Sequence, residues 1–312
     1  MNPQPPLGFA DLSDQTLKVA IGDATTVVLD EAQLIPSIGL VVKILVDYNP
    51  DVQFVVTGSS ALELACGINE SMTGRKYEFE LHPLSFEEMT RHTDLLSESQ
   101  LIPHRMVYGY YPRVVTQIGR EEENVRELRN GYLYKDLLAY QQIRKPALLE
   151  NLVRALALQV GNEVSYNELS QHLGLVKEAV ERYIDLLEKS YVLFRLPALS
   201  RNMRNEIKRD RKIYLHDVGI RNAVISNFNP MEIRGDTGYL WENFCTVKRM
   251  KTLAYHRKSV NRFFWRTHTK LEIDYVEEYG ASCTVTSSNA TRTPRRKYPR
   301  PSWKPIRAAR SR

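Results

Sequence analysis

Two short β-branched runs with one helical segment between them set the strongest limit on how this chain folds. TTVVLD (residues 25–30) and VQFVVTGSS (residues 52–60) have the composition of strands buried on both faces, and SIGLVVKILVDY (residues 37–48) has the pattern of a helix. A strand, a helix and a strand within about 35 residues form a βαβ unit. The sequence therefore predicts a parallel sheet with a right-handed crossover.

The first of these strands ends in two acidic residues, Asp30 and Glu31. P-loop ATPases of the AAA+ type build their Walker B site in this way, with the aspartate holding the magnesium shell and the glutamate orienting the attacking water. A plain, solvated strand end has the same short pattern. Asp30 and Glu31 are therefore candidate catalytic residues, and Asp30 is the candidate magnesium ligand.

The end of the second strand adds a second polar position. Thr57 and Ser59 follow its apolar run, at the place where AAA+ ATPases put sensor 1, a small polar residue that contacts the γ-phosphate or the attacking water. A Gly-Ser turn without a function is the alternative. Because the carboxyl ends of parallel strands face the same crevice, both polar positions belong to one candidate site.

Further helices and strands are predicted after this unit. ALELACGI predicts a helix, YEFELHPL a strand, and SFEEMTRH a helix that begins with a serine cap. Residues 100–160 have a helical pattern. The order helix, turn, helix, strand follows in SYNELSQHLGL, VKEAVERYIDLLEKS and YVLFRLPAL, and this order is typical of a winged helix-turn-helix.

The third part of the chain begins near Lys212 with KIYLHDVGIRNAV. A helix is predicted in GYLWENFCTVKRMKTL and a hairpin in FFWRTHTKLEIDYVEEY. After Tyr279 the chain is rich in Arg, Pro, Ser and Thr, and we predict no regular element there.

The net charge of +6 comes from the end of the chain. Nine Lys or Arg residues and no acidic residue lie between Arg292 and Arg312, and the rest of the chain has 34 basic and 37 acidic residues. The body of the protein is therefore mildly acidic, which argues against a protein that coats nucleic acid with its whole surface.

Other classes are excluded by what the sequence lacks. No stretch reaches the roughly 18 apolar residues of a membrane span, and the start, MNPQPPLGF, lacks both parts of a secretory signal. The three cysteines are far apart, and the seven histidines do not have the spacing of a metal site. We expect a cytoplasmic protein that does not associate with a membrane.

Several stretches together resemble one family. These are, in order, LDEAQLIPSIGLVVKILVD, VTGSSALEL, TGRKYEFELHPLSFEE, YGYYPRVV, YLYKDLL, IYLHDVGIRNAV, WENF and EIDYV. Over about residues 10–278 the chain resembles the prokaryotic AAA+ ATPases that carry a C-terminal domain of unknown function, a domain similar to PD-(D/E)xK nucleases.

The resemblance implies magnesium-dependent ATP hydrolysis that drives a conformational output, with ATP and magnesium as cofactors. It assigns metal and water to Asp30 and Glu31 and phosphate sensing to Thr57. Arg75, in TGRKYEF, matches a basic position after sensor 1, where it would contact phosphate or a neighbouring subunit. An exposed or ion-paired arginine is the alternative.

The sequence departs from the family at the phosphate-binding loop. A P-loop ATPase needs Gly-x₄-Gly-Lys-[Ser/Thr], whose backbone N–H groups and lysine hold the phosphates. No Gly-Lys dipeptide is present, and only 29 residues precede Asp30. We therefore expect a truncated member with severely reduced nucleotide affinity and negligible ATP turnover.

A second departure lies in the nuclease-like part. Such sites use a helix Glu, a strand Asp and a following Glu-x-Lys to hold magnesium. Glu242 in LWENF and Asp274 in EIDYV match the first two positions, but no acidic residue follows Glu278. We expect a vestigial metal site without catalysis. The change of composition after Tyr279 suggests out-of-frame translation or a basic arm that binds nucleic acid.

These observations predict an α/β chain with several parts. A partial P-loop AAA+ core with a parallel sheet spans residues 1–100, and a helical region with a winged helix at about 150–200 spans residues 101–205. A truncated restriction-endonuclease-like α/β domain spans residues 206–278, and a basic disordered tail spans residues 279–312.

The competing function is a non-enzymatic regulator that binds DNA through the winged helix and the basic tail. The charges of the second predicted winged-helix segment weaken this alternative, because residues 177–189 carry a net charge of −1. Residues 201–212 have six basic and two acidic residues and are a better candidate for phosphate contact, although a solvated loop has the same composition. Oligomeric state is not predicted.

Overall fold

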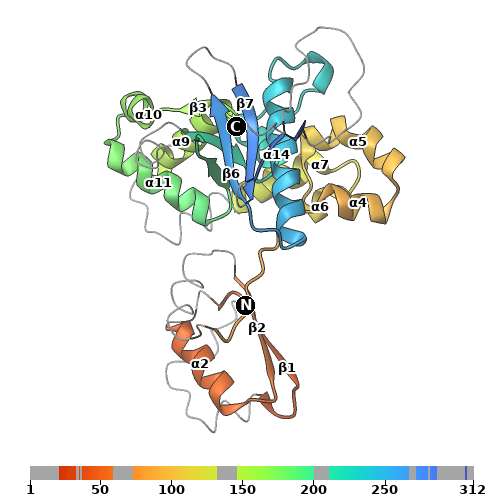
Figure 1. The fold of residues 1–312 in the computed structure, drawn as a ribbon, viewed down its shortest axis with the longest axis vertical. Coiled ribbons are helices and arrows are strands. Elements are labelled where there is room, and N and C mark those ends of the chain that lie inside the picture. The colour runs from red at the N-terminus through yellow and green to blue at the C-terminus, as the bar shows by residue number, and fades with distance from the viewer. Residues whose placement is uncertain are drawn as a thin grey trace. The chain divides into compact units, whose positions relative to one another are not determined.

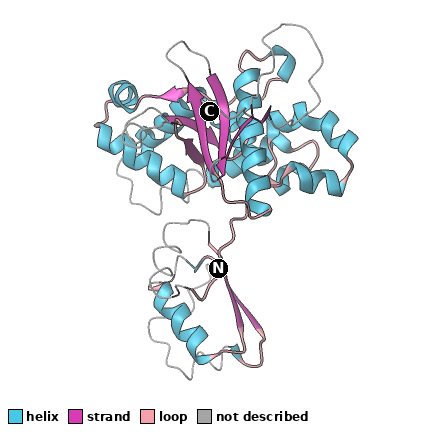
Figure 2. Ribbon diagram, in the orientation of Figure 1, coloured by secondary structure: helices cyan, strands magenta, loops and turns pink. Residues whose placement is uncertain are grey.

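The computed structural model describes residues 21–32, 35, 37–58, 72, 74–131, 146–199, 211–266, 272–279, 282–286 and 306–307 (Figures 1 and 2). The chain divides into two compact units, one of residues 1–79 with 189–191 and one of residues 80–188 with 192–312. The helix predicted at ALELACGI, part of the helical pattern of residues 100–160 and most of the basic tail lie outside the described residues.

The first unit contains the predicted parallel βαβ arrangement. Strand β1 (Thr26–Leu29) pairs in parallel with β2 (Gln53–Val56), and helix α2 (Ile38–Tyr48) connects them. Leu29 and Val56 pack from the two strands against a buried cluster that includes residues of α2. The members of this cluster are Ala32, Ile38, Val42 and Met72.

The prediction that both strands are buried on two faces is wrong. Side chains along β1 and β2 alternate between exposed and half-buried, and Val28 and Val55 are 60% and 39% exposed. A two-stranded sheet packed on one helix buries only one face, because side chains alternate between the faces of a strand. The described sheet of this unit has these two strands.

The strand predicted at YEFELHPL does not form a ladder, so this prediction is also wrong. Residues 76–82 lie in no strand, and Tyr77, Phe79 and Leu81 are exposed. An alternating pattern makes a strand only where a neighbouring strand supplies hydrogen-bond partners for its backbone. No described strand pairs with this segment.

The helix predicted at SFEEMTRH forms as α4 (Phe86–His92), and the predicted serine cap is confirmed. The Ser85 hydroxyl accepts a hydrogen bond of 3.1 Å from the Glu88 backbone N–H, and the Glu88 carboxylate accepts one of 2.7 Å from the Ser85 N–H. This reciprocal arrangement satisfies two N–H groups that a helix start otherwise leaves without partners.

The second unit is mostly helical. Its described helices after α4 are α5 (Leu95–Tyr108), α6 (Pro112–Thr116), α7 (Glu121–Leu128), α9 (Pro146–Leu158), α10 (Tyr166–Leu173), α11 (Lys177–Lys189), α13 (Val218–Ile225), the 3₁₀ helix η4 (Met231–Ile233) and α14 (Thr237–Tyr255). A buried cluster joins α4, α5, α13, η4 and α14. It consists of Met89, Ile102, Met106, Val107, Tyr110, Val218, Met231, Leu240 and Phe244.

A three-stranded antiparallel sheet crosses this unit. Strand β5 (Arg211–Leu215) lies between β3 (Glu163–Val164) and β4 (Leu193–Leu196). Helices α10 and α11 lie between β3 and β4 in the sequence, so the predicted order helix, turn, helix, strand is present. The turn begins at Gly174, whose φ of 62° ends α10 in the left-handed region that glycine adopts without strain.

The predicted hairpin is confirmed and continues into a larger sheet. Strand β6 (Asn261–Arg266) pairs antiparallel with β7 (Glu272–Tyr279), and β7 pairs with β8 (Ser282–Thr286), which pairs with β9 (Ile306–Arg307). The expectation of no element after Tyr279 is therefore wrong. The sequence SCTVT of β8 contains β-branched residues that suit a strand.

Candidate functional site

The predicted Walker B and sensor 1 residues meet at the carboxyl ends of β1 and β2. The Thr57 hydroxyl donates a hydrogen bond to Oδ1 of Asp30. Backbone hydrogen bonds fix this position, since Thr57 N–H donates to Leu29 O at 2.8 Å and Ala32 N–H donates to Thr57 O at 3.0 Å. The parallel register thus brings together two polar side chains that lie 27 positions apart.

Glu31 lies at a sharp turn directly after β1. Its φ of 50° is in the left-handed region, which is uncommon for a residue with a side chain. The turn leaves Glu31 exposed and places the next residue, Ala32, in the core. Non-glycine residues are held in this conformation chiefly where the surrounding structure requires it, and such positions are common in functional sites.

Two further residues, Arg75 and Ser59, were predicted for this site. Arg75 forms an ion pair of 2.6 Å with Asp47 at the end of α2, and both side chains are more than 40% exposed. This contact corresponds to the ion-paired alternative for Arg75. Ser59 lies outside the described residues.

Glu242 and Asp274 are also brought together, and a lysine lies between them. The Lys212 Nζ atom is 2.8 Å from Oε1 of Glu242 and 3.1 Å from Oδ1 of Asp274, and it also contacts Oε1 of Glu272. Lys212 is 1% exposed. The Tyr214 hydroxyl donates a further hydrogen bond of 2.6 Å to Glu242.

The electrostatics of this cluster favour a charged lysine. Burial alone would lower the pKa of Lys212, but the carboxylates of Glu242 and Asp274 outweigh burial and raise it. Burial raises the pKa of Glu242, and Lys212 opposes that rise. Lys212 is therefore the counter-ion of the buried Glu242 carboxylate and of its neighbour Asp274.

Sequence reasoning missed Lys212, Glu272 and Tyr214 as members of this cluster. A signal was present in the spacing of Glu272 and Asp274, since residues two apart on a strand share a face. Lys212 and Tyr214 have the same spacing on β5. Which face of β5 meets which face of β7 depends on the tertiary fold, and the sequence pattern does not specify it.

A second group of buried charges surrounds Asp217, at the start of α13. Burial raises the pKa of Asp217, and Lys251 and Lys248 act against that rise. Burial lowers the pKa of Lys251 to about 8, with Asp217 opposing.

His82 and His216 stack with their ring centroids 5.8 Å apart.

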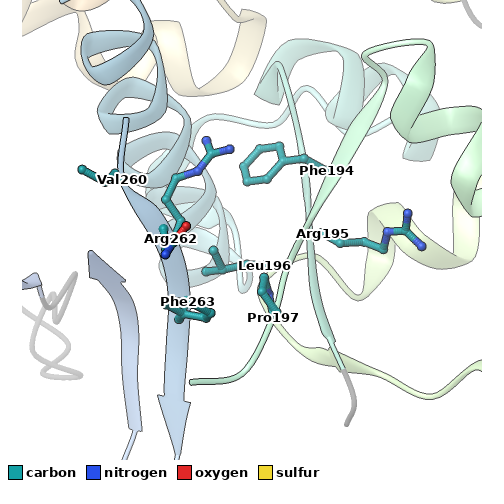
Figure 3. A pocket seen from close by; sticks show the side chains of 8 residues that line it. Phe194, Arg195, Leu196, Pro197, Val260, Arg262 and Phe263 are labelled. Atoms are coloured by element: carbon teal, nitrogen blue, oxygen red, sulfur yellow. The ribbon is translucent and has the colours of Figure 1, made fainter. Parts of the chain in front are cut away.

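A pocket of about 280 Å³ lies between β4 and β6 (Figure 3). The side chains of Phe194 and Arg262 extend toward each other across it, whereas Arg195 points away. Arg195 forms ion pairs with Asp185 at 2.6 Å and with Glu188 on α11. The pocket therefore combines apolar residues such as Phe194 and Phe263 with the polar residues Arg195, Asn261 and Arg262.

Within the described part of the chain, no group of three or more His, Cys, Asp or Glu residues is arranged to hold a metal ion. This finding is compatible with magnesium at Asp30, because magnesium at nucleotide sites is commonly held by one or two carboxylates together with phosphate oxygens. None of the described helices combines the length and apolarity needed to cross a membrane.

Three family models match successive parts of the chain. An AAA domain matches residues 6–90, a domain of unknown function (DUF8612) matches residues 99–231, and another domain of unknown function (DUF4143) matches residues 237–304. The AAA match covers β1, α2 and β2 and supports similarity to AAA-type ATPases. The last match extends beyond Tyr279 into the basic segment.

The curated relatives are uncharacterized proteins. One from Mycobacterium tuberculosis is 28% identical over 283 residues, which is 88% of this chain and 61% of the relative. One from Haemophilus influenzae is 24% identical over 63% of this chain and 52% of the relative. One from Methanocaldococcus jannaschii is 22% identical over 60% of this chain and 46% of the relative. The chain thus spans about 61% of the length of the first of these relatives. No solved structure matches.

Proposed function

We propose, from the AAA-domain match and the geometry at the ends of β1 and β2, that this chain is a nucleotide-binding protein of the AAA type. Its first unit supplies the side of an ATP site that binds magnesium and contacts the γ-phosphate. The observation that carries the proposal is the hydrogen bond from the Thr57 hydroxyl to Asp30 across two parallel strands.

The residues at this edge suit a magnesium-nucleotide complex. Asp30 would hold the ion, and Thr57 would orient the carboxylate while its oxygen accepts a hydrogen bond from water or contacts phosphate. The bound ion would neutralise charge on the phosphate oxygens. Glu31, exposed at the turn after β1, would orient a water molecule as a general base.

ATP affinity from this sequence is expected to be low. A nucleotide-binding loop contributes several backbone N–H groups and a lysine to the phosphates, and the sequence has no Gly-Lys dipeptide. The Asp30 carboxylate and the Thr57 hydroxyl contribute the magnesium-dependent part of ATP binding. Binding should therefore require magnesium, and turnover should be negligible.

The test is a titration of the full chain with magnesium-ATP and, separately, with Mn²⁺ alone, followed by NMR. We expect Mn²⁺ to broaden the backbone amide signals of Glu31 and Thr57, and Asp30→Ala to weaken magnesium-ATP binding by at least about tenfold. Asp51→Asn is the matched control, because Asp51 is an exposed carboxylate in the turn before β2. Equal binding by the Asp30→Ala variant and the unsubstituted chain would refute the site.

Turnover is tested separately. We expect phosphate release by the chain to equal that of Glu31→Gln, the variant that removes the proposed water-orienting carboxylate. Sustained release above that variant would contradict the expectation of negligible turnover, while leaving the proposed nucleotide site in place.

We propose a packing role for the winged-helix part. Arg195 on β4 forms ion pairs with Asp185 and Glu188 of α11. This basic side chain is therefore engaged within the protein, in packing β4 against α11. DNA binding by this part or by the basic tail would appear as salt-dependent affinity for duplex DNA. Loss of that affinity on deletion of residues 292–312 alone would indicate nonspecific contact with phosphates.

A further inference from the structure

We propose that the ammonium group of Lys212 takes the place of a metal ion among Glu242, Glu272 and Asp274. The fold of the second unit then does not require a metal ion at this cluster. The carboxylates of Glu242, Glu272 and Asp274 bind a divalent cation only when the charge of Lys212 has been removed. This assignment differs from the magnesium site that the resemblance to nucleases implies.

The geometry places one cation among three anions. The carboxylates come from helix α14 and strand β7, and the ammonium group comes from β5. An ammonium group has three N–H donors and no acceptor, so Lys212 can donate to each of the three carboxylates. The Tyr214 hydroxyl donates to Oε1 of Glu242, the same oxygen that contacts Lys212.

The lysine cannot easily leave this position. Lys212 lies on the central strand of its sheet, opposite Glu163 on one side and Leu196 on the other. Its side chain is also close to the ring of Phe264, with Nζ 5.6 Å from the ring centroid. A buried lysine anchored on both sides would have to be displaced, or share the site, before a divalent ion entered.

Electrostatic repulsion argues against a divalent ion and the Lys212 ammonium group occupying the cluster together. A divalent ion bound to the same three carboxylates would lie only a few ångströms from the ammonium group, in an environment where like charges repel strongly. A further cation already lies at the edge of the cluster, because Arg266 Nε is 3.7 Å from Oε2 of Glu272. The residues present therefore suit an internal cation and do not suit magnesium.

Removal of the Lys212 charge would reverse this preference, so that the cluster would bind a divalent ion. Lys212→Met keeps an unbranched side chain of similar length but has no charge, so the three carboxylates would lose the cation between them, and Arg266 would remain at the edge of the cluster beside Glu272. Three oxygen-donor groups in one place are a suitable ligand set for Mn²⁺. A single substitution of Lys212 would thus create an oxygen-donor metal site in this cluster.

The experiment measures Mn²⁺ binding by calorimetry and by the melting temperature with Mn²⁺ or with EDTA. All variants are made in an Asp30→Ala background, so that the proposed nucleotide site does not contribute to the signal. We expect the parent to melt at the same temperature with Mn²⁺ or EDTA. Lys212→Met should bind one Mn²⁺ and melt at a higher temperature in its presence, and adding Asp274→Asn should abolish both effects.

Two outcomes would overturn the proposal. One is stoichiometric Mn²⁺ binding by the parent that is lost in Asp274→Asn, because it would show that the lysine does not exclude the ion. The other is a folded Lys212→Met or Lys212→Gln variant that binds no Mn²⁺. Circular dichroism checks folding, and the measurement on the parent decides the first outcome even where neither lysine variant folds.

Discussion

Oδ2 of Asp217 accepts a hydrogen bond of 2.8 Å from the backbone N–H of Tyr110, a residue 107 positions earlier in the chain. Oδ1 of the same carboxylate accepts hydrogen bonds from the backbone N–H groups of Gly219 and Ile220, at 2.8 and 3.2 Å. One side chain therefore caps helix α13 and joins it to the segment that follows α5.

Asp217→Ala should be one of the most destabilising single substitutions in the second unit. It leaves three buried N–H groups without an acceptor and removes the larger of the two opposing charges of Lys251, the other being Glu88. The expected loss in the free energy of unfolding is about 3–5 kcal/mol. Asp94→Ala is the matched control, because Asp94 caps α5 through Leu96 and Ser97 in an exposed position. Asp94→Ala should lower the free energy of unfolding by about 0.5–2 kcal/mol. Urea unfolding of both variants checks the difference, and equal losses would contradict it.

Gly219→Ala should also destabilise this helix start. A Cβ atom at residue 219 would lie 2.0 Å from the backbone oxygen of Tyr108, which cannot move aside as a flexible side chain can. The expected cost is about 1–3 kcal/mol or more. Gly238→Ala, in the first turn of α14, places its methyl group in open space and should cost nothing. Melting temperatures of the two alanine variants test this contrast.

Acid should destabilise the second unit through two histidines. Burial lowers the pKa of His82 to about 4 and that of His216 to about 3, and Lys251 and Arg262 contribute to both shifts. The unfolded imidazoles bind protons near pH 6.5, so between pH 6.5 and 4 the unfolded state holds more protons. Stability is therefore complete above pH 6.5 and falls as the pH decreases, by about 1.4 kcal/mol per pH unit for each histidine.

The measurement is the free energy of unfolding between pH 5 and 6.5. His216→Phe should reduce the mean slope over this range by about 1 kcal/mol per pH unit, because the unfolded imidazole is half protonated at about pH 6.5 and almost fully protonated at about pH 5. His172→Gln, at an exposed position on α10, is the control. An unchanged slope in His216→Phe would mean that this imidazole is protonated in the folded protein.

Cys245 should resist alkylation while the protein is folded. Cys245 is half-buried in α14, and this burial raises the pKa of its thiol to about 12, with Glu242 adding to the rise. At pH 8 the reactive thiolate is then roughly a thousandfold scarcer than for an ordinary cysteine. Mass spectrometry of the peptide containing Cys245, after iodoacetamide treatment with and without urea, measures the effect. Similar labelling in both conditions would contradict it.

Local sequence patterns predicted the elements whose causes are local. The parallel pairing of β1 and β2, the serine cap of α4 and the β6–β7 hairpin depend on periodicity and capping chemistry over a few residues. The meeting of Asp30 and Thr57 was also predictable, because parallel strands present their carboxyl ends at one edge.

Features that depend on distant partners were not predictable in the same way. The alternation in YEFELHPL is typical of a strand, but the segment has no described partner strand. Lys212 joins its carboxylates across 30 and 62 positions, and periodicity does not specify which strands meet at that distance. The two-sided burial expected for β1 failed because the number of layers around a sheet is a property of the whole fold.

The described part of the first unit has a small buried cluster, which bears on how long the protein survives in a cell. Among the residues that the structure describes there, few side chains are buried and alternate side chains of β1 and β2 are exposed, which gives a low free-energy cost for local opening. Proteases cut chains in proportion to the time they spend open. Degradation should therefore begin in the βαβ segment, and a nucleotide that binds there would lengthen the lifetime of the whole chain by mass action.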